Sequence, residues 1–342
     1  MIDLRSDTVT IPTDAMLHAM VTARVGDDIM GDDPTVKELE ALAAELTGKQ
    51  AGLFCASGTM ANQIAVMAFT QRGDEVIVGD TSHVYQLESS GMAALSQTQA
   101  CLIGTSSPDY DLDEIADLIR PEGVQQPHTG LLCLENTKDL NHGYVVPLEN
   151  MQQASEIAHA RGVPVYLDGA RIFNAALVLK VTVREVMEPF DAGMFVLTKG
   201  LSCPFGSLLV GTTDFIKTAR WIKQRLGGGF RQIGYMAAPG ILALRSGDTQ
   251  LRQDHALAQK LASALAELHL LDVPLDMVQS NIVLANVKSS NIPRDVWVTR
   301  LAEAGIRVKP IAKYNFRMVT HRSIEDADID ATIKAITGVL HG

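Results

Sequence analysis

Two residues in this sequence stand where an apolar run ends and are suited to cofactor chemistry. Lys199 follows the run 195–197 and precedes a glycine, which is a poor place to pack a lysine but a good place to form a Schiff base with an aldehyde. Asp168 ends the run 165–167, where a carboxylate could face a pyridine nitrogen and keep it protonated. The plainer alternatives are a lysine that reaches solvent and an aspartate that caps a turn.

A third motif, Ser57-Gly58-Thr59, follows the apolar run 53–55 and precedes a helical pattern. The free amides and the dipole of a helix start favour a phosphate there, although taken alone the motif is better explained as a plain helix cap. It is neither a Walker loop nor a dinucleotide-binding fingerprint, because it lacks the residues that define them. A phosphate-binding turn, an acid and a lysine together indicate pyridoxal phosphate.

Three further residues fit an amino-acid substrate on such a cofactor. His83 follows the run 75–78, and its ring could stack on the pyridine and carry a proton. Arg171 and Arg317 are suited to bind a substrate carboxylate through paired hydrogen bonds. A loop histidine and surface ion pairs are the alternatives, and for Arg317 alone the ion pair is favoured.

Alternation of short apolar runs with amphipathic stretches predicts the elements that position these residues. It indicates a mostly parallel, helix-covered sheet, and such sheets bind ligands at the carboxyl ends of their strands, where all the motifs fall. The seven predicted strands are 53–55, 75–78, 100–103, 131–134, 163–167, 194–197 and 208–210.

The chain is expected to divide into an arm plus large domain (1–250) and a small α+β domain (251–342). The arm, up to Pro34, reads as polar and irregular apart from a helix over 13–21. Helices are predicted over 35–47, 112–119, 148–160, 214–226, 232–244 and 251–268. In the small domain we expect strands over 282–287, 306–309 and 317–320, a helix over 294–304 and a final helix.

Composition narrows the class of protein. The net charge of −11, with no basic stripe to offset it, argues against a nucleic-acid partner. The four cysteines lie far apart and form no metal-ligand pair, which is typical of free thiols in a cytoplasmic protein. No apolar stretch approaches membrane-spanning length, and charges near Met1 argue against a signal peptide.

Taken together, the motifs resemble the low-specificity L-threonine aldolases, which are fold-type I pyridoxal phosphate enzymes like aspartate aminotransferase. The similarity runs over nearly the whole chain. It is densest at residues 2–10, 25–28, 33–35, 57–59, 134–137, 167–175 and 227–232.

The resemblance implies roles for the site residues. Lys199 would be the Schiff-base lysine, Asp168 the partner of the pyridine nitrogen and His83 the stacking ring. Gly58 and Thr59 would hold the phosphate, with Arg231 reaching a phosphate across a subunit interface, and Ser6, Arg171 and Arg317 would bind the substrate carboxylate. The family implies a homodimer or homotetramer with composite active sites, and cleavage of a β-hydroxy-α-amino acid to glycine and an aldehyde.

Departures from the family concern the side chain of the substrate. Gln125 stands where the family has a histidine that acts on the β-hydroxyl. A glutamine can orient the hydroxyl but cannot take its proton near neutral pH. His128, His83 or a water would then have to accept that proton. Thr137-Lys138-Asp139 replaces Thr-His-Asn, while Met30, Leu87 and Gln224 replace a tyrosine, an aromatic and a basic residue. A racemase, a β-eliminating lyase or an aminotransferase on the same cofactor face is therefore the alternative. A non-catalytic pyridoxal phosphate protein and an NAD-dependent dehydrogenase are less favoured.

Overall fold

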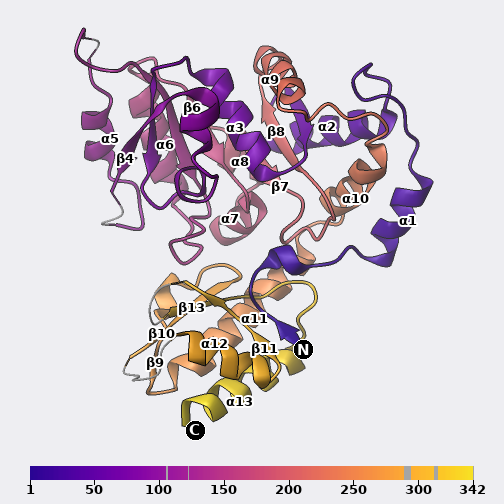
Figure 1. Ribbon diagram of the computed structural model, residues 1–342, viewed down its shortest axis with the longest axis vertical. Helices are drawn as coiled ribbons and strands as arrows, with labels where there is room; N and C mark the ends of the chain where they lie inside the picture. Colours follow the sequence, from indigo (N-terminus) through magenta and orange to yellow (C-terminus); the bar gives the residue numbers. More distant parts are fainter. Residues whose placement is uncertain (105–106, 122, 289–293, 312–314, 342) are drawn as a thin grey trace.

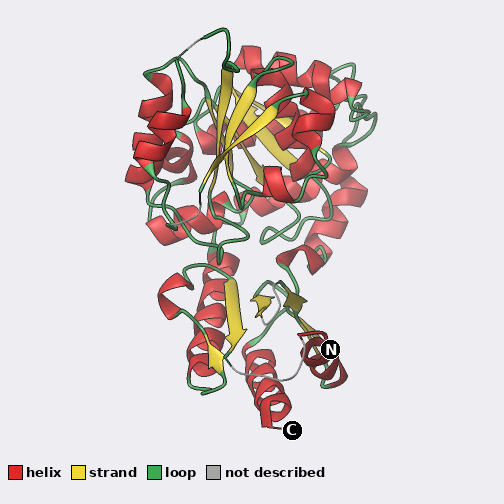
Figure 2. Cartoon of the chain, turned by 60° about the vertical axis from the view of Figure 1, so that its left-hand side comes forward, coloured by secondary structure: helices red, strands yellow, loops and turns green. Residues whose placement is uncertain are grey.

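A seven-stranded sheet forms the centre of the larger part of the molecule (Figure 2). The structure, a computed structural model, describes residues 1–104, 107–121, 123–288, 294–311 and 315–341. The strand order is β2-β8-β7-β6-β5-β3-β4, and all seven predicted strands are present. Their bounds are β2 (Ala51–Cys55), β3 (Glu75–Gly79), β4 (Gln99–Ile103), β5 (Thr129–Glu135), β6 (Val165–Asp168), β7 (Ala192–Val196) and β8 (Ser207–Gly211).

Six of the seven strands run in the same direction. Strands β4, β3, β5, β6 and β7 pair in parallel, whereas β8 is antiparallel to both β7 and β2. The carboxyl ends of β2, β3, β5, β6 and β7 therefore lie at one edge of the sheet. The predicted α/β class and the mostly parallel seven-stranded sheet are confirmed.

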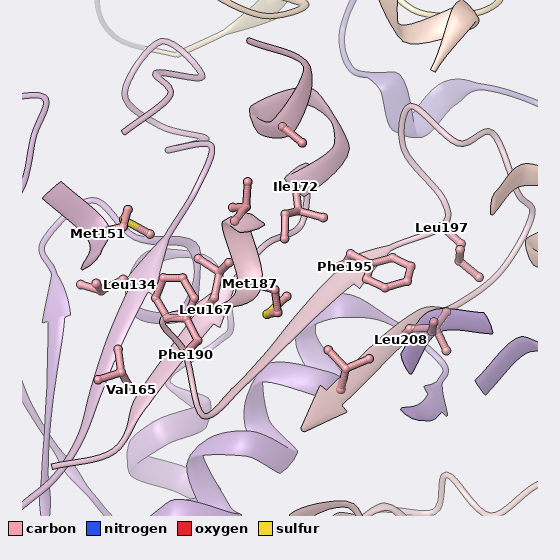
Figure 3. Packing of buried hydrophobic residues seen from close by; sticks show 14 of the residues in the cluster. Leu134, Met151, Val165, Leu167, Ile172, Met187, Phe190, Phe195, Leu197 and Leu208 are labelled. Atoms are coloured by element: carbon pink, nitrogen blue, oxygen red, sulfur yellow. The ribbon is translucent and has the colours of Figure 1, made fainter. Parts of the chain in front are cut away.

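Helices cover both faces of the sheet because alternate strand residues are apolar on both sides. Phe54, Leu167 and Phe195 point into one core, part of which Figure 3 shows, while Leu53 and Tyr166 point into the other. Among the helices, α2 begins with the side chain of Asp33 capping Thr35 and Val36 and ends at Gly48 in the left-handed conformation. The helices of this part are α1 (Asp14–Thr22), α2 (Pro34–Thr47), α3 (Gly58–Phe69), α4 (His83–Gln86), the π-helix η2 (Met92–Ser96), α5 (Leu112–Leu118), α6 (Leu148–His159), α7 (Ile172–Leu179), α8 (Val183–Met187), α9 (Thr213–Arg225) and α10 (Gly234–Arg245).

The C-terminal part has a separate apolar core and lies at one end of the molecule (Figure 1). A four-stranded sheet, β12-β13-β10-β9, packs there with α11, α12 and α13. The predicted strand 306–309 is split at buried Val308, because β11 and β12 pair with different strands. The bounds are α11 (Thr249–Ala266), β9 (Leu271–Asp272), η3 (Leu275–Met277), β10 (Ile282–Val287), α12 (Arg294–Glu303), β11 (Ile306–Arg307), β12 (Lys309–Pro310), β13 (Asn315–Val319) and α13 (Asp326–His341).

The first residues of the chain belong to this C-terminal part. Strand β1 (Ile2–Asp3) pairs in parallel with β11, and Leu4 is buried in the second core, whereas we expected an irregular arm. A two-residue strand is too short to show periodicity, so its pairing could not be predicted from the sequence. The chain then crosses to the larger part through the 3-10 helix η1 (Asp7–Val9). A domain boundary near residue 250, where α11 begins, stays a prediction.

Among the described residues, no helix combines the length and the apolar character needed to cross a bilayer.

The burial of Leu4 gives a test of the arm's role. Leu4→Ala removes a side chain that is 0% exposed, so it should destabilise the fold by about 3 kcal/mol in urea unfolding. Leu17→Ala is the matched control, because Leu17 is 46% exposed and its truncation should change the free energy of unfolding little. Equal effects of the two substitutions would contradict the assignment of the arm to the second core.

Candidate active site

The sheet brings the predicted site residues to its carboxyl edge. Asp168 is the last residue of β6, Lys199 lies in the segment between β7 and β8, and His83 begins α4 just after β3. The amino end of α3 follows β2 at the same edge. Residues that are more than a hundred positions apart in the chain therefore face one site.

Asp168 is a buried carboxylate with a fixed orientation. Its Oδ2 accepts a hydrogen bond from Asn62 Nδ2 at 2.8 Å and its Oδ1 accepts one from the Ala170 amide at 3.1 Å. Burial raises the pKa of Asp168, while the charges of His83 and Lys199 and the hydrogen bond from Asn62 act in the opposite direction. Such a carboxylate is more stable beside a cation, and a protonated pyridine nitrogen would be one.

His83 is held by a second buried carboxylate, Glu88. The His83 Nδ1 lies 2.9 Å from Glu88 Oε1, and Asn62 and Gln63 donate to the two Glu88 oxygens at 2.7 and 2.6 Å. The hydrogen bond that His83 donates to Glu88 raises the pKa of His83, and burial partly opposes it. With Nδ1 engaged in this way, Nε2 is the ring nitrogen that can meet a ligand.

The ligand atoms of His83, Glu88 and Asp168 lie within 4.8 Å of one another, a spacing that a metal ion could also bridge. Both Glu88 oxygens are, however, already taken up by side-chain amides and His83. The amide donors make this a hydrogen-bond network suited to orient carboxylates rather than an open cation site.

Lys199 is half-buried in the same region. Burial lowers its pKa first and the charge of Arg171 lowers it further, against the opposing charges of Asp139 and Asp7. The backbone of the segment is fixed, since the Lys199 carbonyl accepts from the Ser202 amide at 2.8 Å. A lysine with a lowered pKa more readily provides the free amine that attacks a carbonyl.

The start of α3 offers backbone amides to an anion. The Ser57 side chain accepts from the Met60 amide and its carbonyl accepts from Ala61, while the amides of Gly58 and Thr59, at the first two helical positions, have no carbonyl within the helix to bond. A Cβ at Gly58 would come within 2.9 Å of the Val196 side chain, so only a glycine fits there without displacement. Both Ser57 and Thr59 are exposed.

Arg171 and Arg317 are both buried and are paired with carboxylates of the chain. Arg171 donates from Nε and Nη2 to Asp7 at 2.7 Å each, and from Nη1 to Asp139. Arg317 donates to Asp139 at 3.0 and 3.2 Å. Burial alone would raise the pKa of Asp7 and of Asp139, but the arginine charges hold both pKa values below the ordinary range. The surface ion pair considered as the alternative for these arginines is wrong, because both are buried.

Two predicted residues, Ser6 and Arg231, are placed less directly. Ser6 caps η1 by accepting from the Thr8 amide at 3.3 Å, and it is the neighbour in sequence of Asp7, which pairs with Arg171. Arg231 pairs with Asp27 of its own chain at 2.9 Å, and its side chain is 57% exposed. Its predicted contact with a phosphate across a subunit interface stays a prediction.

Gln125 is not brought to this site within the chain. It is exposed and precedes β5, whose first residues lie at the amino edge of the sheet, opposite Lys199. His128 lies at that same edge, where its carbonyl accepts from the Glu75 amide and its ring contacts Asp74 at 3.3 Å. The structure of the single chain therefore does not support the role toward the substrate that the family implies for Gln125. Of the two histidines proposed as a base, only His83 lies at the site.

Four residues at the site were missed by sequence reasoning: Asn62, Glu88, Asp7 and Asp139. Asn62 also accepts a hydrogen bond from the Tyr166 hydroxyl at 2.8 Å, so one amide connects β6, α3 and Glu88. Asp7 lies inside a motif quoted for the resemblance, and Asp139 was noted only as part of a departure from the family. Arg171 and Arg317 were the signal that could have led to these two aspartates, since a buried arginine needs a buried acid.

Glu88 should control the protonation of His83. We expect Glu88→Gln to lower the pKa of His83 in an NMR titration of its ring, because the amide cannot stabilise the imidazolium as the carboxylate does. Glu38→Gln, which removes a surface acid paired with Arg245, should leave that pKa unchanged. Because the folded pKa lies above 6.5, the pair stabilises the fold fully below that pH, and the contribution is lost as the pH rises through the raised value.

Comparisons with known proteins agree with this geometry. The model of the beta-eliminating lyase family matches residues 3–288. The low specificity L-threonine aldolase of Escherichia coli (strain K12) is 40% identical over 326 residues, which is 95% of each chain. The probable low-specificity L-threonine aldolase 2 of Arabidopsis thaliana is 36% identical over 345 residues, covering 99% of this chain and 97% of that protein.

Solved structures show the same fold at low sequence identity. The threonine aldolase of Leishmania major superposes with a TM-score of 0.83 at 17% identity, covering 99% of this chain and all of that one. A serine palmitoyltransferase of Sphingomonas wittichii gives a TM-score of 0.79 at 14% identity, covering 99% and 87%. The family suggested by the motifs is thereby confirmed: the chain belongs to the low-specificity L-threonine aldolases, within the beta-eliminating lyase family.

Proposed function

We propose that this protein is a pyridoxal phosphate-dependent lyase that cleaves the Cα–Cβ bond of a β-hydroxy-α-amino acid, such as threonine or allo-threonine, to glycine and an aldehyde. The observation that carries the proposal is the position of Lys199 at the carboxyl edge of the sheet with the buried Asp168, in a chain 40% identical to a low specificity L-threonine aldolase. The reaction is inferred from the relatives, and the site supports it with an amine and a buried carboxylate of the kinds that it needs.

The residues at the sheet edge fit pyridoxal phosphate. Lys199 supplies the amine for covalent attachment, and Asp168, oriented by Asn62, holds a proton on the ring nitrogen. Gly58 and Thr59 offer amides to the phosphate. Bound in this way, the cofactor supplies an electron-withdrawing ring for the electron pair released at Cα.

His83 is the group we assign to the β-hydroxyl. Its ring would hold the cofactor by stacking, and its Nε2, left free by the contact of Nδ1 with Glu88, would accept the proton of the β-hydroxyl. Arg171 and Arg317, together with Ser6, hold the substrate carboxylate. Gln125 takes no part from within the chain.

A homo-oligomer completes this proposal. Large apolar side chains are exposed near the arm and on the outer helices, including Met30 at 72% and Trp221 at 66%, which supports burial against further copies of the chain. Arg231 would then reach the phosphate of a neighbouring copy. Cys55, Cys101, Cys133 and Cys203 are free thiols, which supports the cytoplasmic location expected from the sequence.

The second candidate is β-elimination on the same cofactor face. It is favoured by the match to the beta-eliminating lyase model and by the position of Gln125 away from the site. Racemisation and transamination remain weaker alternatives, because no contact at the site favours them specifically over Cα–Cβ cleavage.

Product analysis separates these reactions. The cofactor-loaded protein should convert threonine, allo-threonine or phenylserine to glycine and the matching aldehyde, and Lys199→Ala should lower the rate by roughly a thousandfold and remove the absorbance of the lysine-bound cofactor. Lys180→Ala, at the exposed end of α7, is the control and should retain both. Pyruvate from serine without glycine from any β-hydroxy amino acid would favour β-elimination instead.

The pH dependence tests the role of His83. A base must be neutral to accept a proton, so kcat/KM should rise as the pH increases through the raised pKa of His83, which lies above 6.5. In Glu88→Gln the same rise should move to lower pH. A profile that is identical in the two proteins would exclude His83 as the group that titrates.

A further inference from the structure

The arginines assigned to the substrate carboxylate already hold two carboxylates of the chain. We call Asp7, Asp139, Arg171 and Arg317 the carboxylate cluster. Its members come from the arm, from the segment after β5, from the start of α7 and from β13. All four are buried, and Asp139, the most exposed, is only 9% exposed.

Asp139 stands where a substrate carboxylate would have to bind. Arg317 presents both terminal nitrogens to it, Nη2 to Oδ1 at 3.0 Å and Nη1 to Oδ2 at 3.2 Å, which is the paired geometry that a guanidinium offers to any carboxylate. Arg171 adds its Nη1 to the same Oδ1, while its Nε and Nη2 are used by Asp7. Terminal nitrogens of both arginines therefore meet at Asp139.

The charges of the cluster balance without a ligand. Two arginines face two ionised carboxylates, so a third carboxylate entering the same buried space would carry an uncompensated negative charge. Asp7 is also held by Asn281 Nδ2 at 3.3 Å, and its two oxygens are fixed by Arg171. The side-chain oxygens of Asp139, in contrast, accept hydrogen bonds from the two arginines, while its backbone amide donates to Glu135 Oε1 at 3.0 Å.

We propose that Asp139 is an internal competitor of the substrate, whose carboxylate occupies Arg317 and Arg171 until the α-carboxylate of an amino acid replaces it. The inference rests on the proposed function and deepens it by naming a residue that sets the affinity for amino acids. Binding then exchanges one carboxylate for another, so the arginines contribute less net affinity than free arginines would.

Asp139→Asn tests the exchange directly. In the cofactor-loaded protein, spectral titration should show glycine binding roughly tenfold more tightly to Asp139→Asn than to wild type, because no ionised group has to be displaced. Methylamine, which has the amine but no carboxylate, should bind both proteins alike. Asp248→Asn removes the same charge from a surface pair with Arg252 and should leave both affinities unchanged. Glycine affinity that is unchanged or weaker in Asp139→Asn would overturn the proposal.

A second measurement covers the case in which Asp139→Asn folds poorly or carries no cofactor. In a crystal structure of wild-type protein with glycine bound, Arg317 should contact the glycine carboxylate, with Asp139 turned away from its terminal nitrogens. Glycine bound on the Nε edge of Arg317, with Asp139 still in place, would overturn the proposal, since that buried Nε has no partner among the described residues.

Failure here is distinguishable from failure of the proposed function. Glycine binding requires no bond cleavage, so the exchange can be supported even if no β-hydroxy amino acid is cleaved. If the protein bound no pyridoxal phosphate, acetate would serve as the probe. It should raise the Tm of Asp139→Asn more than that of wild type, and an equal shift in both would count against Asp139.

Discussion

Pairing of buried charges between Asp7, Asp139, Arg171 and Arg317 is the constraint on which the arrangement of the two parts depends. An arginine taken out of water without a carboxylate partner is strongly destabilising, so each member requires the others to be in place. Because Arg317 lies on β13 and Arg171 lies beside β6, the pairing also fixes the C-terminal sheet against the edge of the larger one. The guanidinium groups proposed to bind the substrate carboxylate are therefore the same groups that connect the two parts.

A second buried network prepares the cofactor side of the site. Asn62 joins Asp168, Glu88 and the Tyr166 hydroxyl, so a single amide orients both Asp168 and the carboxylate that holds His83. Fully bonded networks of this kind keep polar groups rigid in a low-dielectric interior. The rigidity matters because a proton acceptor is effective only when its free nitrogen has a fixed position.

Much of the fold could be predicted because its signals are local. The strand ending at Asp168 and the capped start of α2 follow from apolar runs and capping residues near in sequence, and the edge at which Lys199 lies follows from the parallel connections. Short elements without periodicity, such as β1 and the break at Val308, depend on partners far away in the chain and could not be read locally.

The site was predictable to the extent that its chemistry needs particular residue types. Lys199, Asp168 and His83 were found in this way, and the structure places all three at one edge. Glu88 could not be found, because nothing in its neighbourhood of the sequence shows that it will be buried against His83. Gln125 illustrates the opposite problem, since a role assigned by matching a motif does not reveal which edge of the sheet the residue occupies.

The pairing of β1 with β11 has a consequence for how the polypeptide matures on the ribosome. Ile2 can find Ile306, and Leu4 can reach the amide of Val319, only after nearly all of the 342 residues have been synthesised. The arm, which also carries Asp7, therefore has no β11 partner to pack against during most of synthesis. A product that stops before β11 lacks both the partner of β1 and Arg317, so it cannot form the complete carboxylate cluster.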